Sequence, residues 1–245
     1  MIARRIHYCW FGGQPMPLQA KRCLASWAYY LPDYEVVRWD EAAFDPASHP
    51  FTAAAHSAGK FAFVADYVRM HVLAKEGGIY LDVDVEVCAS FDELLDNEFF
   101  IGLEDRQRFA TAVIGASVGH WLPVHMLEYY GRVQFDEERL SELVNVNEVS
   151  RLMLARGFTG SGEEEFRGTE RVLGVGRLAD AVRAPKVGIQ PLARHLYAGS
   201  WRRRDGKSLA SRLARSARKV PEHLGAWLAW QMFRLRTRLR RFRHR

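Results

Sequence analysis

One segment, Gly77-Gly-Ile-Tyr-Leu-Asp-Val-Asp-Val-Glu-Val87, constrains this chain most, because acids interrupt an otherwise apolar, β-branched run. As a single strand it places Tyr80, Asp82, Asp84 and Glu86 on one face and the aliphatic residues on the other. Neighbouring carboxylates repel each other, and a cation relieves that repulsion. Magnesium and manganese favour oxygen ligands, and proteins commonly hold them with carboxylates plus substrate phosphates. The segment therefore predicts a site where a metal binds a diphosphate; the alternative is a half-exposed strand with a solvated acidic face.

The composition fits one large domain, alone or with an appendage. The chain has 245 residues, of which 48% are hydrophobic, enough for a full core. No window has the length of a transmembrane helix, and the N-terminus lacks the apolar run of a signal peptide. The three cysteines (Cys9, Cys23 and Cys88) have no metal-binding spacing, which favours a reducing compartment. These features predict a cytoplasmic protein.

Charge is distributed unevenly along the chain. Residues 202–245 hold fifteen Lys and Arg against two acids, a net charge of +13. Residues 1–201 hold the other twenty Lys and Arg against twenty-seven acids, a net charge of −7. The basic character therefore belongs to the tail, and the acidic body argues against a nucleic-acid-binding core.

Hydrophobic periodicity predicts strands that alternate with helices. The predicted strands are 4–11, 34–39, 79–87, 99–103 and 112–116, and the predicted helices are about 18–31, 56–76, 122–130 and 137–156. This alternation indicates an α/β fold with a mostly parallel sheet.

The helix before the acidic segment is apolar almost all round, which is typical of a buried helix. Asp66 and Arg69 lie one turn apart on it, and buried charges need partners. They could form an ion pair with each other. They could instead border a polar pocket and bind substrate hydroxyls.

Four blocks carry a resemblance to a known family. They are Ile6-His-Tyr-Cys-Trp-Phe-Gly-Gly13, Phe61-Ala-Phe-Val-Ala-Asp-Tyr-Val-Arg69, Gly77-Gly-Ile-Tyr-Leu-Asp-Val-Asp84 and Ala198-Gly-Ser-Trp201. In this order they resemble glycosyltransferase family 32, DxD sugar transferases that include bacterial capsular-polysaccharide enzymes. More distantly, the pattern is similar to the clostridial glucosylating toxins. The resemblance covers residues 1–201 and not the tail.

The resemblance implies a GT-A fold, a Rossmann-like mixed and mostly parallel sheet flanked by helices. It further implies transfer with retention from a nucleotide-sugar, assisted by Mn²⁺ or Mg²⁺. The implied catalytic residues are Asp82, Asp84, Asp66 and Arg69. The implied donor-binding residues are His7, Tyr8, Trp10, Asp66, Arg69, Asp82, Ser200 and Trp201, and the implied metal ligands are Asp84, His195 and Asp82.

Residue 196 departs from the family pattern. Relatives often carry a second histidine where this chain has Leu196. His195 is therefore the candidate imidazole ligand, a role that neutral imidazole can fill for manganese.

The tail, residues 202–245, predicts a basic helical appendage. A stripe of Leu, Met and Phe recurs at three- and four-residue steps after Pro221, flanked by Trp227 and Trp230 among arginines. This pattern is typical of a helix that lies on an anionic membrane, and we assign residues 207–245 to that contact. The stripe could instead pack on the body or form a coiled coil, and the arginines could bind nucleic acid, which we do not expect.

Together these features predict a metal-dependent, retaining hexosyltransferase in residues 1–201, cytoplasmic and peripheral to the inner face of the plasma membrane. It would move a sugar, from UDP in preference to GDP, onto a lipid-linked or growing surface glycan such as capsule, exopolysaccharide or lipopolysaccharide. Two alternatives are a non-catalytic sugar-nucleotide-binding protein and a toxin-like enzyme that glycosylates protein.

Overall fold

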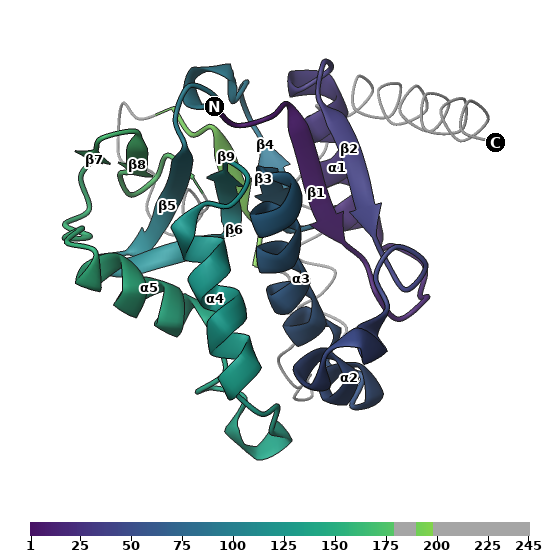
Figure 1. The fold of residues 1–245 in the computed structure, drawn as a ribbon. Coiled ribbons are helices and arrows are strands. Elements are labelled where there is room, and N and C mark those ends of the chain that lie inside the picture. The colour runs from purple at the N-terminus through teal and green to yellow at the C-terminus, as the bar shows by residue number, and fades with distance from the viewer. Residues whose placement is uncertain (179–189, 198–245) are drawn as a thin grey trace, which may run out of the picture.

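A seven-stranded sheet runs through the described part of the chain in the order β2-β1-β3-β6-β5-β8-β7 (Figure 1). The computed structural model describes residues 1–178 and 190–197. Five strands run in one direction, and β6 and β7 run against them, so the predicted mixed, mostly parallel sheet is confirmed. The strands are β1 (Arg5–Cys9), β2 (Glu35–Trp39), β3 (Gly78–Leu81), β5 (Phe99–Asp105), β6 (Arg108–Ala116), β7 (Glu165–Arg167) and β8 (Glu170–Leu173).

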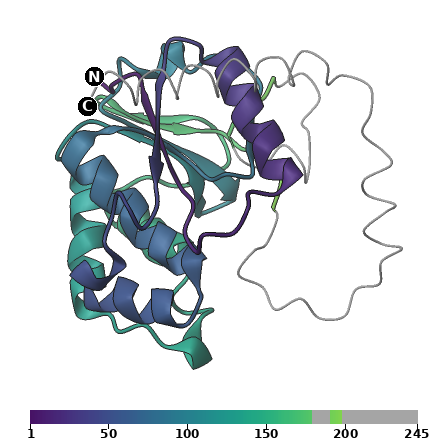
Figure 2. The ribbon, with the colours of Figure 1, turned by 90° about the vertical axis from the view of Figure 1, so that its right-hand side faces the viewer.

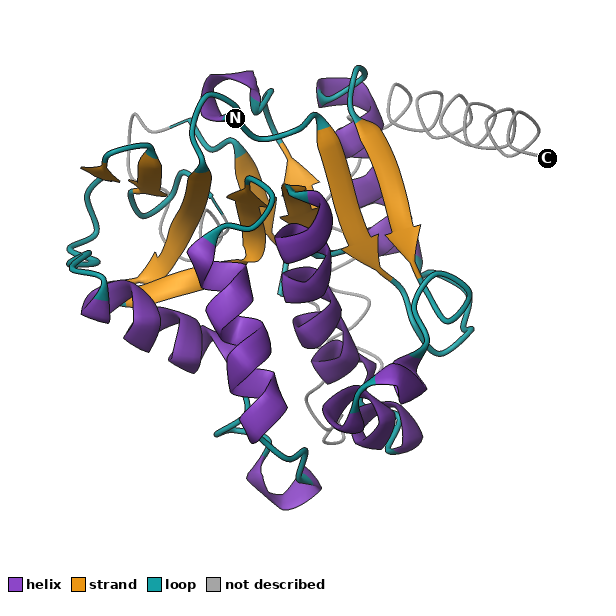
Figure 3. Ribbon diagram, viewed as in Figure 1, coloured by secondary structure: helices purple, strands orange, loops and turns teal. Residues whose placement is uncertain are grey.

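Helices cover both faces of the sheet (Figures 2 and 3). One face packs against α1 (Leu18–Tyr30), and the other carries a second apolar cluster shared by the remaining helices. These are α2 (Pro50–Ser57), α3 (Phe61–Glu76), α4 (Trp121–Arg132) and α5 (Asn145–Ala155). Single 3₁₀ turns lie at Pro46–Ser48, Asp92–Leu94 and Glu137–Arg139. Among the described helices, none is both long and apolar enough to cross a bilayer.

Helix α1 forms where the sequence predicts it. Its residues Ala20, Cys23, Leu24 and Trp27 recur at helical spacing and are buried against the sheet. The indole Nε1 of Trp27 donates a hydrogen bond to the carbonyl of Val85 at 2.8 Å. Helix α1 is therefore fixed directly to the segment that follows the two acids.

The acidic segment is not one strand, so the prediction of a shared acidic face is wrong. Strand β3 ends at Leu81, residues 82–84 turn, and Val85–Val87 forms β4. Strand β4 pairs with β9 (Ala193–His195) in a separate two-stranded sheet. The turn is closed by a 3.0 Å hydrogen bond from Val85 N–H to Asp82 C=O. A turn lets the two acids point to different partners, which a continuous strand would not allow.

The predicted helix 56–76 is also interrupted. Gly59 has a φ of +67°, a left-handed conformation that ends α2, and α3 begins afresh at Phe61. Similarly, the predicted helix 137–156 resolves into a 3₁₀ turn followed by α5. The predicted tail helices lie outside the described residues.

Candidate active site

The polar centre of the molecule lies just beyond the carboxyl end of β3, where α3 passes close to the sheet. Ligand sites of open α/β sheets are found at such strand ends. The guanidinium of Arg69 is only 4% exposed. Its Nη2 lies 3.0 Å from Asp66 Oδ1 and 2.9 Å from Asp82 Oδ1. The ion pair considered as an alternative therefore exists, and the same arginine also joins helix α3 to the acidic turn.

Arg69 is held by more than its two carboxylates. Its Nη1 donates to the carbonyl of Thr111 on β6, and its guanidinium lies 4.5 Å above the ring of Tyr80. The Tyr80 hydroxyl donates to Asp82 Oδ1 at 3.1 Å. Burial disfavours the charged guanidinium, yet the adjacent acids outweigh burial and hold the pKa of Arg69 above its ordinary value. The arginine is thus a fixed positive charge in a site largely closed to water.

Two residues of this network were missed by the sequence analysis. The Nδ2 of Asn145 donates to Asp66 Oδ1 at 2.9 Å, and Thr111 Oγ1 donates to Asn145 Oδ1 at 3.0 Å. Both residues are buried. The sequence signal was weak, because Asn145 falls inside the predicted helix 137–156, where nothing marks it as a partner of Asp66. The contact of Asn145 with Asp66, and that of Thr111 with Asn145, each join residues far apart in the chain.

Asp66 is poised between protonation states. Its burial, together with the nearby charge of Asp82, outweighs the attraction of Arg69 and raises the pKa of Asp66 to about 7. A carboxyl group with such a pKa can donate or accept a hydrogen bond near neutral pH. This property suits contact with a sugar hydroxyl, which is itself both donor and acceptor.

The three predicted metal ligands come together. Ligand atoms of Asp82, Asp84 and His195 all lie within 4.8 Å of one another. Strand pairing places His195 opposite Val85, and its Nε2 lies 3.2 Å from Asp84 Oδ1. Burial disfavours the imidazolium, but the hydrogen bond and charge of Asp84 prevail and raise the pKa of His195.

The chemistry of this group fits a divalent ion. Carboxylate oxygens and an imidazole nitrogen are donors that manganese accepts, and magnesium accepts the oxygens. Arg69 and Tyr80 both bind Oδ1 of Asp82, so Oδ2 is the oxygen that can face a ligand. Within the described residues, the buried Nδ1 of His195 makes no hydrogen bond.

The first of the four sequence blocks, residues 6–13, contributes a histidine that is buried inside the protein. His7 is fully buried; its Nε2 donates to the Gly77 carbonyl at 2.9 Å and its Nδ1 accepts from Trp39 Nε1 at 3.1 Å. Burial lowers the pKa of His7, which agrees with this neutral tautomer. Both ring nitrogens are thus used inside the protein, and the imidazole joins β1, β2 and the end of α3.

The other predicted donor-binding residues divide into two groups. Tyr8 is buried with its ring edge-on to Trp27 at 5.6 Å. Trp10 is half-buried and donates from Nε1 to the Gln14 carbonyl at 2.7 Å. Ser200 and Trp201 lie outside the described residues.

Comparison with known proteins finds a described family region in part of the chain. Residues 17–101, which include Asp66, Arg69, Asp82 and Asp84, match the family model described as "Glycosyltransferase sugar-binding region containing DXD motif". "Subversion of eukaryotic traffic protein A" of Legionella pneumophila subsp. pneumophila is 28% identical over 119 residues, 38% of this chain. The aligned part covers 18% of that relative, so this chain spans less than a fifth of its length.

The fold is similar to that of solved glycosyltransferases. The structure described as "PaToxG Glycosyltransferase" superimposes with a TM-score of 0.53 at 18% identity, covering 64% of this chain and 69% of that one. An active-site mutant of LgtC aligns over 92% of this chain and 99% of its own, at 17% identity and a TM-score of 0.38. The matched DXD region agrees with the expected enzyme class, glycosyltransferase, and the likeness to the solved structure shows a related fold.

Proposed function

We propose that the protein is a metal-dependent, retaining hexosyltransferase that takes its sugar from a nucleotide donor, with UDP favoured over GDP. One observation carries this proposal: the buried Arg69 bridges Asp66 and Asp82, directly beside the group formed by Asp82, Asp84 and His195. One strand end thus holds a fixed cation, a carboxyl group that can become neutral, and a set of donors suited to a metal. Together these groups suit a sugar joined to a diphosphate. We further propose that the acceptor is a lipid-linked or growing surface glycan.

The residues divide the work between the two halves of the donor. Asp82, Asp84 and His195 would hold Mn²⁺ or Mg²⁺, and a bound ion would supply positive charge that stabilises the departing diphosphate. Arg69 and Asp66 would hold the hydroxyls of the transferred sugar. The hydrogen bond that Arg69 donates to the Thr111 carbonyl and the one that Asn145 donates to Asp66 fix both side chains before the donor arrives, which avoids reorganisation during the reaction.

Retention of configuration needs either a protein nucleophile or attack by the acceptor on the same face of the sugar from which the leaving group departs. The acids nearest the centre are already used: Asp66 and Asp82 bind Arg69, and Asp84 binds His195. We therefore favour same-face attack, in which a leaving-group oxygen takes the acceptor's proton. A base from the region of Glu104, whose charge acts on His195, is the alternative route for the acceptor's proton.

A second candidate is a glycosyltransferase that modifies protein. The name of the Legionella relative, "Subversion of eukaryotic traffic protein A", describes interference with a eukaryotic cell. Such an enzyme could use the same donor site, and the two candidates differ only in the acceptor. A third possibility, donor binding without transfer, would also leave the donor site as described.

Donor hydrolysis without acceptor tests the proposal. The protein is incubated with manganese and a panel of UDP- and GDP-sugars, and release of nucleoside diphosphate is measured. We expect release from one donor, lost with EDTA and reduced on the order of 10²-fold or more by Asp84→Asn. Asp96→Asn, an exposed acid in a loop, is the matched control and should retain activity. Silence across the panel, with no donor binding by calorimetry, would contradict the proposal, whereas binding without release would favour the non-catalytic alternative.

A further inference from the structure

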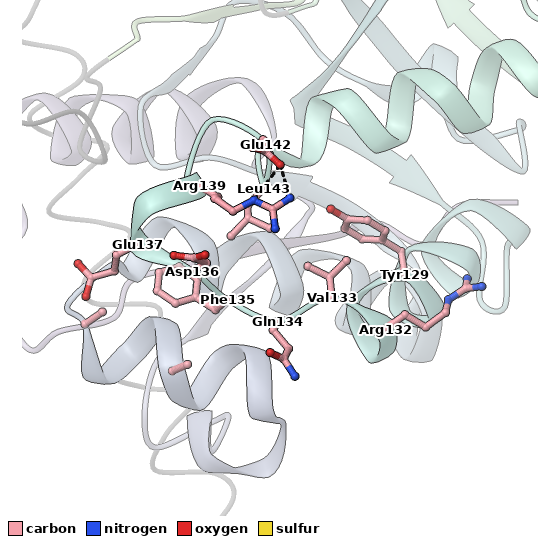
Figure 4. Close-up of a pocket in the computed structure, with 12 residues that line it drawn as sticks. Tyr129, Arg132, Val133, Gln134, Phe135, Asp136, Glu137, Arg139, Glu142 and Leu143 are labelled. Atoms are coloured by element: carbon pink, nitrogen blue, oxygen red, sulfur yellow. Dashed lines mark hydrogen bonds and ion pairs between the residues drawn. The ribbon is translucent and has the colours of Figure 1, made fainter.

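A hollow of about 690 Å³ lies between helix α2 and the segment that joins α4 to α5. Its volume falls within the range of small-molecule sites, roughly 300–1,000 Å³. In Figure 4, Arg139 and Glu142 lie on one side of it and Gln134 on the opposite side. Tyr129 stands toward one end, and Phe135 and Asp136 toward the other.

The lining combines aromatic rings with planar polar groups. Tyr129 and Phe135 are half-buried, so each presents part of a ring to the hollow. Gln134 is exposed, and Arg139 is paired with Glu142 through a 3.0 Å hydrogen bond. Pyranose rings have an apolar C–H face that packs on aromatic rings, and their hydroxyls bond to amide and carboxylate groups. The polar groups in the lining make the hollow unsuitable for a lipid chain.

The charged side chains around the hollow indicate the charge of the ligand that it can bind. Two arginines, Arg132 and Arg139, face three acids, Asp136, Glu137 and Glu142, around the hollow. The two signs nearly cancel, so the hollow offers little attraction to a phosphate or to a strongly anionic polymer. It is suited to an uncharged glycan.

Two short segments, residues 129–130 and 143–145, connect the hollow with the donor site. Tyr129 lines the hollow, while the next residue, Tyr130, is buried and its pKa is raised by burial and by the charge of Asp66. Leu143 also lines the hollow, and two residues later Asn145 bonds to Asp66. The segment 143–145 thus links the lining of the hollow to Asp66 through a hydrogen bond, and Tyr130 lies within range of the charge of Asp66.

We propose that this hollow binds a neutral stretch of the acceptor glycan and positions its end for reaction at the Asp66–Arg69 centre. The inference rests on the proposed function, because it assigns the acceptor to a carbohydrate. It adds a second sugar-binding site, formed by α2, the end of α4 and the segment before α5. Bound there, the glycan would present a terminal hydroxyl toward the donor sugar.

The test fills the hollow without touching the donor site. Ala54 is exposed on α2 and lines the hollow, so Ala54→Trp should occupy it. Ser57→Trp, exposed on the same helix but not in the lining, is the matched control. Gln134→Ala is a milder variant that removes one polar contact from an exposed position. The probe is a panel of neutral tetrasaccharides of glucose, galactose or mannose, and binding is read by saturation-transfer NMR.

We expect at least one tetrasaccharide to bind the wild-type protein and Ser57→Trp equally. Binding should fall about tenfold or more in Ala54→Trp, equivalent to about 1.4 kcal/mol, and measurably in Gln134→Ala. Absence of binding across the panel, or binding that Ala54→Trp retains, would overturn the inference. Donor hydrolysis is measured on the same samples: its absence in the wild-type protein would count against the proposed function, while the tetrasaccharide result would still decide the hollow.

Discussion

Arg69 is the residue around which the candidate site is organised. It is buried, paired with two carboxylates and supported by the Tyr80 ring and the Thr111 carbonyl. A buried cation with such partners is costly to disturb, since loss of one partner leaves another charge uncompensated. The arrangement therefore holds the carboxyl groups in one geometry before any ligand binds.

Asn145 provides a prediction at this scale. Asn145→Ala removes the hydrogen bond that orients Asp66, and we expect donor hydrolysis to fall roughly 10–100-fold, as is typical for partners of liganding groups. Steady-state rates and donor affinity measured by calorimetry would separate a loss of turnover from a loss of binding. Asn147→Ala, on an exposed position of the same helix, is the control. Wild-type hydrolysis in Asn145→Ala would show that Asp66 does not depend on this contact.

At the scale of elements, short breaks place the site's groups. The turn after β3 separates Asp82 from Asp84, so that one meets Arg69 and the other meets His195. Pairing of β4 with β9 then brings in a residue more than a hundred positions later in the chain. Regular strands on either side give this irregular turn a rigid support.

Close packing between β5 and β6 leads to a prediction about stability. A Cβ placed on Gly115 would lie 2.1 Å from Cε1 of Phe100, whereas one on Gly131 of α4 would meet open space. We expect Gly115→Ala to destabilise the protein by about 1–3 kcal/mol through overpacking. Gly131→Ala should stabilise it by up to about 1 kcal/mol, because alanine favours helix. Urea unfolding of both variants measures the difference, and effects of the same sign would contradict the packing described.

At the scale of the whole molecule, the sheet carries the candidate site, and an acidic body precedes a strongly basic tail. We propose that residues 207–245 hold the enzyme on the inner face of the plasma membrane, close to lipid-linked acceptors. The apolar stripe and the arginines support this proposal, because each basic residue near an anionic surface contributes about 1 kcal/mol.

Vesicle sedimentation tests the tail. The full chain should bind vesicles that contain phosphatidylglycerol, fail to bind pure phosphatidylcholine vesicles, and be released by high salt, which screens the charges. A chain ending at residue 201 is the control and should remain in the supernatant. Equal binding to both lipids, or binding without the tail, would count against an electrostatic anchor.

The class of fold and the candidate residue types could both be predicted from the sequence. Hydrophobic periodicity predicted α1 and the alternation of strands with helices, because these patterns depend on neighbouring residues. The residue types Asp66, Arg69, Asp82 and Asp84 indicated a cation and a polar pocket, and the family resemblance added His195. Local pattern also misled, since the β-branched run after Gly78 looked like one continuous strand.

Which of these groups meet depends on contacts between segments distant in the chain, so the folded structure was needed to see it. The engagement of His7 with Gly77 and Trp39, and that of Asn145 with Asp66 and Thr111, depend on segments brought together by the sheet. A hydrogen bond requires its two heavy atoms to lie about 3 Å apart. Hydrophobic periodicity within one segment does not predict such a distance between two segments. For this reason the sequence could name the reactive residue types, whereas the folded chain alone showed how each one is held.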